Sequence, residues 1–220
     1  LQFTVTSEAF TAPKTTDADY IVAAQTLNAK VAGDTFTLTA TTELDHPRVV
    51  TVLITDANAS LTNFSIIVKG TDRDGKAVEE SFHFGGGLSQ TGKVEFKKIR
   101  EVELDQVAGT QDVADVLDVG IGVYTNVWVL LANKPIKWQP ESVTAGTASA
   151  KDTDYYMDYA NGRIKAISGG NIAAEEACTI SYTIGQIWLD LSSLPDLIRA
   201  ESVIYPVGDM PQNVIQTDLF

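Results

Sequence analysis

Alternation of apolar and polar residues is the dominant pattern in this chain, and it is typical of half-buried antiparallel strands. In 63–70, for example, Phe64, Ile66 and Val68 fall on one face and polar residues fall on the other. Between 93 and 104 the alternation changes phase at Lys97 and Lys98, which predicts a β-bulge. The stretches with this pattern, which turn residues separate, are 34–40, 48–56, 63–70, 77–84, 93–104 and 177–184.

Helical periodicity is nearly absent. One short helix is predicted over 194–201, with Ser192 or Ser193 as its N-terminal cap. The predicted fold is therefore mainly β, an antiparallel β-sandwich built as two small β units, with one short C-terminal helix.

Residues 153–168 are predicted to form a β-hairpin about a two-residue Asn161-Gly162 turn of type I′. That register places Tyr159 opposite Ile164 and Asp158 opposite Lys165. The apolar face would then carry Tyr159, Met157, Ile164 and Ala166, with Tyr156 on the other face.

Three residues near this hairpin are candidates for the core. We expect Tyr159 and Tyr182 to pack in the protein interior instead of binding a ligand. Cys178 alternates in phase with Tyr182 and is predicted to be a buried, unreactive thiol.

Composition and turn signals divide the chain into four segments. We expect an N-terminal arm over 1–29, a β-sandwich unit over 30–126, a second β unit with the hairpin over 127–203, and a C-terminal tail over 204–220.

The charge balance excludes some partners. A net charge of −13 argues against direct binding to nucleic acid, because phosphate contacts require clustered Lys and Arg. No apolar run of about 18 residues is present, so no membrane contact is expected. The first residues show no secretory signal, and a single cysteine cannot form an internal disulfide.

Candidate chemistry is sparse. His46 and His83 lie far apart in the sequence without further ligands, so no metal site is predicted. Asp72 and Asp74 in "TDRDG" fit a hairpin turn better than a calcium loop. The glycine-rich "FGGGLSQTG" leads into a strand and not into the helix that a phosphate site requires. We therefore expect no catalytic residue and no cofactor, and the chain is predicted not to be an enzyme.

Both chain ends carry apolar residues without a regular period. These are candidate contacts with a neighbouring subunit or a shell, because exposed apolar side chains favour association. The alternative is that the ends complete their own domains. The candidate interaction residues are Phe3, Val5, Phe10, Val214, Ile215, Leu219 and Phe220.

Two segments resemble sequences of structural proteins of tailed bacteriophages. The first, 45–104, combines a "PR" before a strand, a "GTD..G..V.E" hairpin and a "TG...F..I" strand. The second, 154–184, is "DYYMDYANGRIKAISGGNIAAEEACTISYTI". Together they cover about 90 of the 220 residues. The matching residues of the first segment are Pro47, Arg48, Gly70, Thr71, Asp72, Gly75, Val78, Glu80, Thr91, Gly92, Phe96 and Ile99.

The resemblance implies a non-enzymatic virion protein that assembles in the host bacterial cytoplasm. The expected role is a capsid decoration (cement) protein, bound as a symmetric homo-oligomer to the major capsid protein. An acidic chain suits the outside of a shell that encloses DNA. Two alternatives stay open: a tail or head-to-tail component, and a receptor- or carbohydrate-binding adhesin module that uses Trp128, Trp138 or Trp188.

Overall fold

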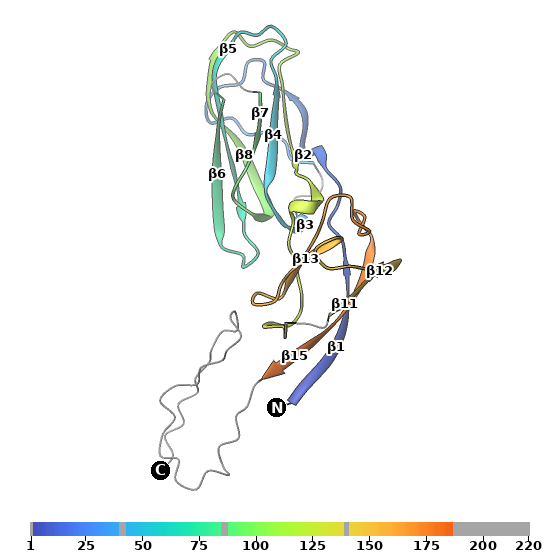
Figure 1. The fold of residues 1–220 in the computed structure, drawn as a ribbon. Coiled ribbons are helices and arrows are strands. Elements are labelled where there is room, and N and C mark those ends of the chain that lie inside the picture. Colours follow the sequence, from blue (N-terminus) through green and yellow to red (C-terminus); the bar gives the residue numbers. More distant parts are fainter. Residues whose placement is uncertain (1, 40–42, 85–87, 139–140, 187–220) are drawn as a thin grey trace, which may run out of the picture. The chain divides into compact units, whose positions relative to one another are not determined.

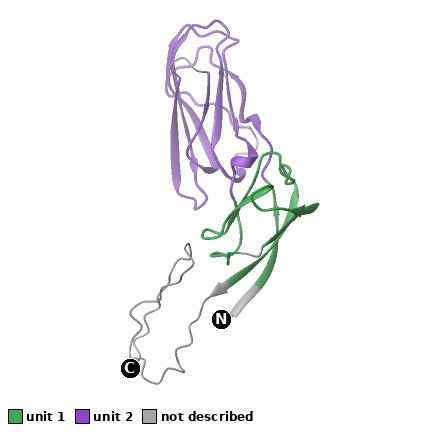
Figure 2. Cartoon of the chain, viewed as in Figure 1, with its two compact units in different colours: residues 1–12, 129–220 green, residues 13–128 purple. Residues whose placement is uncertain are grey.

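The computed structural model describes residues 2–39, 43–84, 88–138 and 141–186, and these residues form a mainly β protein with antiparallel sheets. The chain divides into two compact units (Figures 1 and 2). Unit 1 contains residues 1–12 and the chain from 129 onward, and unit 2 contains residues 13–128. In sequence, unit 2 is therefore an insertion into unit 1.

Unit 2 consists of two four-stranded sheets, with strand orders β2-β9-β4-β7 and β3-β8-β5-β6. A single turn of 3-10 helix, η1 (Tyr124–Asn126), follows the last strand. The strands are β2 (Asp17–Thr26), β3 (Glu43–Arg48), β4 (Val50–Thr55), β5 (Leu61–Thr71), β6 (Ala77–Phe84), β7 (Ser89–Thr91), β8 (Phe96–Gly109) and β9 (Val116–Ile121).

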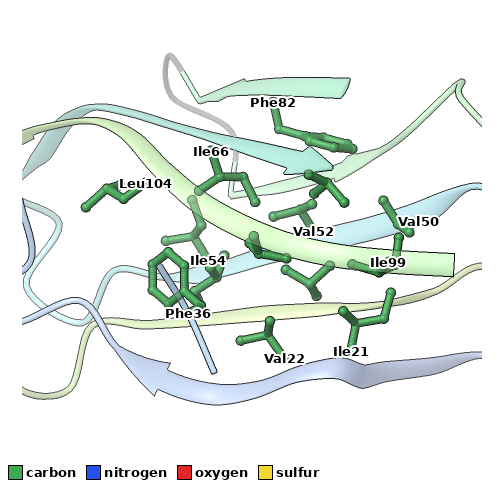
Figure 3. Close-up of a cluster of buried hydrophobic side chains, with 14 of the residues drawn as sticks. Ile21, Val22, Phe36, Val50, Val52, Ile54, Ile66, Phe82, Ile99 and Leu104 are labelled. Carbon is green, nitrogen blue, oxygen red and sulfur yellow. The ribbon is translucent and has the colours of Figure 1, made fainter. Parts of the chain in front are cut away.

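The inner faces of these two sheets share one hydrophobic core (Figure 3). Val50, Val52 and Ile54 of β4 are fully buried, as their alternation predicts. Ile66 of β5 and Phe82 of β6 contribute from the other sheet. Two sheets that enclose one such cluster fit the predicted β-sandwich.

Strand β8 changes phase twice. Its buried residues are Phe96, Ile99, Val102 and Leu104, so the spacing is three, three and then two. The first change confirms the slip predicted at Lys97 and Lys98. The second was not predicted, and it arises where the β5–β8 register shifts between Lys69 and Gly70.

Arg48, at the end of β3, is a buried cation. Its guanidinium donates to the Asp45 carboxylate at 3.2 Å, to the Lys14 carbonyl at 3.2 Å and to the Gly122 carbonyl at 2.6 Å. Lys14 follows the point where the chain enters unit 2, and Gly122 precedes the point where it leaves. This buried hydrogen-bonded charge therefore joins the two ends of the insertion.

Asp45 also binds the entering chain directly, because its Oδ2 accepts the Lys14 backbone N–H at 2.6 Å. Partial burial alone would raise the pKa of Asp45, but the N–H groups of Lys14 and His46 and the charge of Arg48 lower it overall. A lowered pKa in the folded state means that this stabilisation is present above the ordinary value of 3.8 and is lost as the pH falls through the lowered value.

Unit 1 contains a four-stranded sheet of order β1-β15-β11-β12 and a three-stranded sheet of order β10-β14-β13. The buried side chains of these strands include Val143, Ile164, Cys178, Ile180 and Tyr182. The strands are β1 (Gln2–Thr11), β10 (Val129–Leu130), β11 (Ser142–Ala145), β12 (Thr147–Ser149), β13 (Tyr155–Asp158), β14 (Arg163–Ala166) and β15 (Ala177–Gln186).

The predicted hairpin is present, but its register and turn are corrected. Met157 lies opposite Ile164 and Asp158 opposite Arg163, so the connection has four residues and Tyr159 belongs to it. Gly162 has a positive φ of 59° whereas Asn161 does not, which excludes a type I′ turn. The Asp158 carboxylate holds the loop, since it accepts from the Asn161 N–H at 3.1 Å and the Arg163 Nε at 2.8 Å.

The predicted segments differ from the observed units at the N-terminus. The residues predicted as an N-terminal arm or extended segment over 1–29 contain β1 of unit 1 and β2 of unit 2. The observed boundary at 128 lies close to the predicted one at 126. The predicted helix over 194–201 and the tail over 204–220 lie outside the described residues.

Replacement of Arg48 is expected to destabilise unit 2. Arg48→Ala leaves the Asp45 carboxylate and the carbonyls of Lys14 and Gly122 without their donor, which should cost about 3–5 kcal/mol. Lys69→Ala is the matched control in the same unit, because Lys69 forms exposed ion pairs with Glu101 and Glu103 that water screens. Chemical denaturation of both variants measures the difference. Equal losses would contradict the role given to Arg48.

Replacement of Gly162 tests the corrected loop. A Cβ at Gly162 would lie 2.4 Å from the Asn133 carbonyl oxygen, whereas a Cβ at Gly169, which has a positive φ of 80°, would meet nothing within 4 Å. Gly169→Ala should therefore cost about 1–2 kcal/mol from backbone strain alone. Gly162→Ala should cost about 2–4 kcal/mol, since a steric clash is added. If thermal melts rank the two variants in the opposite order, the loop geometry is wrong.

Candidate interaction surface

The N-terminal strand β1 pairs with β15 over its whole length. The register runs without interruption from Gln2 opposite Gln186 to Thr11 opposite Ala177 (Figure 1). Because successive side chains in a strand point to opposite faces, β1 presents one set of residues to the core and one set outward. Thr6, Glu8 and Phe10 lie opposite the buried Tyr182, Ile180 and Cys178 and so form the inward set.

Glu8 is the only charged residue of β1, and its carboxylate is used inside unit 1. It accepts a hydrogen bond of 2.8 Å from the Tyr182 hydroxyl and bonds of 3.1 Å from the Ala132 backbone N–H. The Asn133 side chain donates to the same hydroxyl at 3.0 Å. Burial raises the pKa of Tyr182, and Glu8 adds to that, so the phenol stays protonated and donates to the carboxylate.

Among the described residues of β1, β11, β12 and β15, none on the outward side of this sheet is charged, and Lys137, whose backbone N–H donates to the Thr183 carbonyl at 2.8 Å, borders this set. Val5 is 74% exposed, and the Ser181 hydroxyl donates to the Ser7 hydroxyl at 3.1 Å. We call this set the uncharged face. Its residues are Val5, Ser7, Ala9 and Thr11 of β1, Thr179, Ser181 and Thr183 of β15, Ser142 and Thr144 of β11, and Ala148 of β12.

An uncharged face is unusual on a chain with a net charge of −13. Two strongly acidic molecules repel each other, and they approach best where neither presents charge. The uncharged face is therefore the best candidate for a contact with another protein among the described surfaces.

The predicted interaction residues fall partly on this surface. Val5 points outward, Phe10 is half-buried on the inward side, and Phe3 lies in β1 opposite Gly185. The others, Val214, Ile215, Leu219 and Phe220, lie outside the described residues. Contact of any of them with a neighbour stays a prediction.

The hairpin tyrosines are mostly committed to internal contacts. The hydroxyls of Tyr159 and Tyr155 donate to one oxygen of Glu141 at 2.7 and 3.3 Å. Burial, and then the Glu141 charge, raises the pKa of both phenols. Tyr155 and Tyr182 are buried, and Tyr156 is exposed as predicted. These tyrosines therefore organise unit 1, and only Tyr156 faces solvent.

The residues that the sequence analysis weighed as metal ligands have structural explanations. Asp72 Oδ1 accepts the N–H groups of Asp74 and Lys76, each at 2.9 Å, and Gly75 has a positive φ, so "TDRDG" is a hairpin turn. His83 is exposed on β6, and His46 is half-buried in β3. Within the described ranges, no three His, Cys, Asp or Glu side chains gather as a metal site would require.

Cys178 is a buried free thiol, which confirms its predicted burial. Burial raises its pKa to about 11, and the nearby Glu176 contributes to the rise. The thiol is therefore protonated at neutral pH, which removes the nucleophilic form.

Several residues of the first resembling segment prove to hold the fold of unit 2. A Cβ at Gly70 would lie 2.1 Å from the Lys98 carbonyl oxygen, so only glycine allows β5 to approach β8 there. Glu80 accepts the backbone N–H groups of Lys93 and Val94 at 2.7 and 3.2 Å. Gly92 packs against that carboxylate. The residues of this motif therefore specify turns and close contacts between strands. The burial of Arg48, which also belongs to the motif, was not predicted.

Comparison with protein-family models, with curated proteins and with solved structures finds no match for this chain. No helix in the described part of the chain has the length and hydropathy needed to cross a membrane.

Proposed function

We propose that this chain is a non-enzymatic structural protein of a tailed-bacteriophage virion, and within the virion a decoration (cement) protein on the capsid shell. One observation carries the proposal. The two segments that resemble phage structural proteins lie one in each unit: residues 45–104 run from within β3 to within β8, and residues 154–184 run from β13 to within β15. The resemblance therefore covers strands of both units.

The surface properties support a role in assembly. The uncharged face offers mostly small side chains on a chain with a net charge of −13, which suits contact with a protein and not with nucleic acid. Its proposed partners are the major capsid protein, other virion proteins and further copies of the chain. A tail or head-to-tail position would use the same surface.

An adhesin module is the second candidate, and Trp138 is the observation that favours it. Its side chain is 57% exposed, and the Lys151 ammonium lies 5.8 Å from the Trp138 ring and 5.0 Å from the Tyr159 ring. Exposed aromatic rings of this kind stack on sugars in carbohydrate-binding proteins. Trp128 is half-buried, and Trp188 lies outside the described residues.

Antibodies against the recombinant chain test the proposal on purified particles from the phage that encodes it. Immunogold electron microscopy should label the heads over their whole surface, with hundreds of copies per particle by quantitative mass spectrometry. Label confined to a tail ring or a tail tip would move the protein to the alternative positions. Absence of the chain from purified particles would contradict a virion role.

Glycan binding separates the second candidate from the first. Trp138→Ala should leave incorporation into particles unchanged if the chain is a decoration protein. If wild-type protein instead binds a glycan array and Trp138→Ala abolishes that binding, the adhesin assignment is correct.

A further inference from the structure

Exposed sheet edges are normally protected, because their free N–H and C=O groups pair readily with another strand. Most edges of the described sheets show such protection. Four edge strands are short, with only two to four residues: β7, β10, β12 and β13. Register shifts interrupt β2, which also carries two aspartates, and β3, which also contains Pro47. The last, β6, carries Glu79 and Glu80.

Strand β1 differs from all of these edges. It has ten residues in unbroken register with β15, and it contains no proline, lysine or arginine. Its one charge, Glu8, is bound inside unit 1 by Tyr182 and Ala132. Among the described strands, β15 is the only one that pairs with it. Apart from the inward Glu8, the described part of this edge has none of the prolines, lysines, bulges or short length that protect the other edges.

We propose that β1 pairs antiparallel with β1 of a second copy of this chain, which extends the four-stranded sheet across a two-fold axis. The inference does not depend on the virion assignment. About half of the N–H and C=O groups of β1 point away from β15 and would be satisfied by this pairing.

Charge argues for a second copy as the partner. Each copy carries a net charge of −13, so association between copies requires a region without charge, and β1 lies at the border of the uncharged face. Pairing of a strand with itself also brings like residues together. A self-pairing strand therefore tolerates few outward charges, and the outward set of β1 has none.

The two longest registers that the pleat allows keep the two Glu8 residues from lying opposite each other. Directly opposite residues lie on the same face of a sheet, so the two paired residue numbers must have an even sum. The two longest registers place the two-fold axis at Ser7 or at Thr6. In the first, Glu8 faces Thr6 of the second copy, and in the second it faces Thr4. Neither register brings the two glutamates opposite each other.

A double lysine variant tests both registers at once. In Val5→Lys/Ser7→Lys, an axis at Ser7 places Lys opposite Lys at position 7, and an axis at Thr6 places position 5 opposite position 7. Either repulsion should raise the dissociation constant of the dimer about tenfold or more. The control is Val31→Lys/Val113→Lys, because these valines are 61% and 71% exposed in unit 2, far from β1 in sequence. Sedimentation equilibrium of the full chain measures all three proteins.

Charge reversal tests for recovery of the dimer and not only for its loss. Val5→Glu/Ser7→Glu should also be monomeric by itself, and an equimolar mixture with the lysine variant should restore a dimer through opposite charges. Circular dichroism melts confirm that both variants remain folded. The proposal is overturned if wild-type protein is monomeric, if the lysine variant dimerises as the wild type does, if the control loses the dimer equally, or if the mixture stays monomeric.

Discussion

The pairing of β1 with β15 is the constraint on which the rest of this structure depends. It joins the first described strand to the last, so all of unit 2 lies inside the closed loop between Thr11 and Ala177. Closure of a long loop costs conformational entropy, and this cost rises only slowly with loop length. The ten consecutive residue pairs between β1 and β15, and the burial of Cys178, Ile180 and Tyr182, offset the cost. The four-stranded sheet of unit 1 is complete only when this long-range contact is made.

The same constraint explains the burial of Arg48. An insertion is compatible with its host when its two ends are held near each other, and Arg48 binds the carbonyls of Lys14 and Gly122 at the entering and leaving segments. Asp45 balances the buried charge and holds the Lys14 N–H. The pair holds the entering and leaving segments of unit 2 together. Buried charges of this kind specify a geometry, since removal of either partner leaves the other charge without its counter-charge.

The closing strand also creates the interaction surface. Because β1 is added at the border of its sheet, no second described strand pairs with it, and because Glu8 turns inward to Tyr182, no charged residue of β1 lies on the outward side. The strand that closes unit 1 is thus the same strand on which the proposed pairing of two copies rests.

Local patterns in the sequence predicted local structure well. The alternation of Val50, Val52 and Ile54, the slip at Lys97 and Lys98 and the burial of Cys178 all depend on which face a residue occupies, and alternation reports that directly. The predicted register of the hairpin was wrong, but the shift between the predicted and the observed register is an even number of residues. An even shift leaves each side chain on the same face, so the face predicted for Met157, Ile164 and Ala166 was correct.

The local pattern does not show which two strands pair with each other. The strand β1 was taken for an arm because its partner β15 lies at the far end of the described chain. For the same reason, nothing around Pro47 and Arg48 indicated that a guanidinium would be buried against Lys14 and Gly122. The interaction surface was therefore predicted only through single residues such as Val5, and its uncharged character required the sheet order.

Amide hydrogen exchange of residues 2–11 at several protein concentrations tests most directly whether β1 is an edge built for pairing with another chain. In dilute protein, the amides that donate to β15 should be protected, and the alternate amides, about half of the total, should exchange fast. At high concentration the alternate amides should become protected as well, in step with dimer formation. A protection pattern that does not change with concentration would contradict the account.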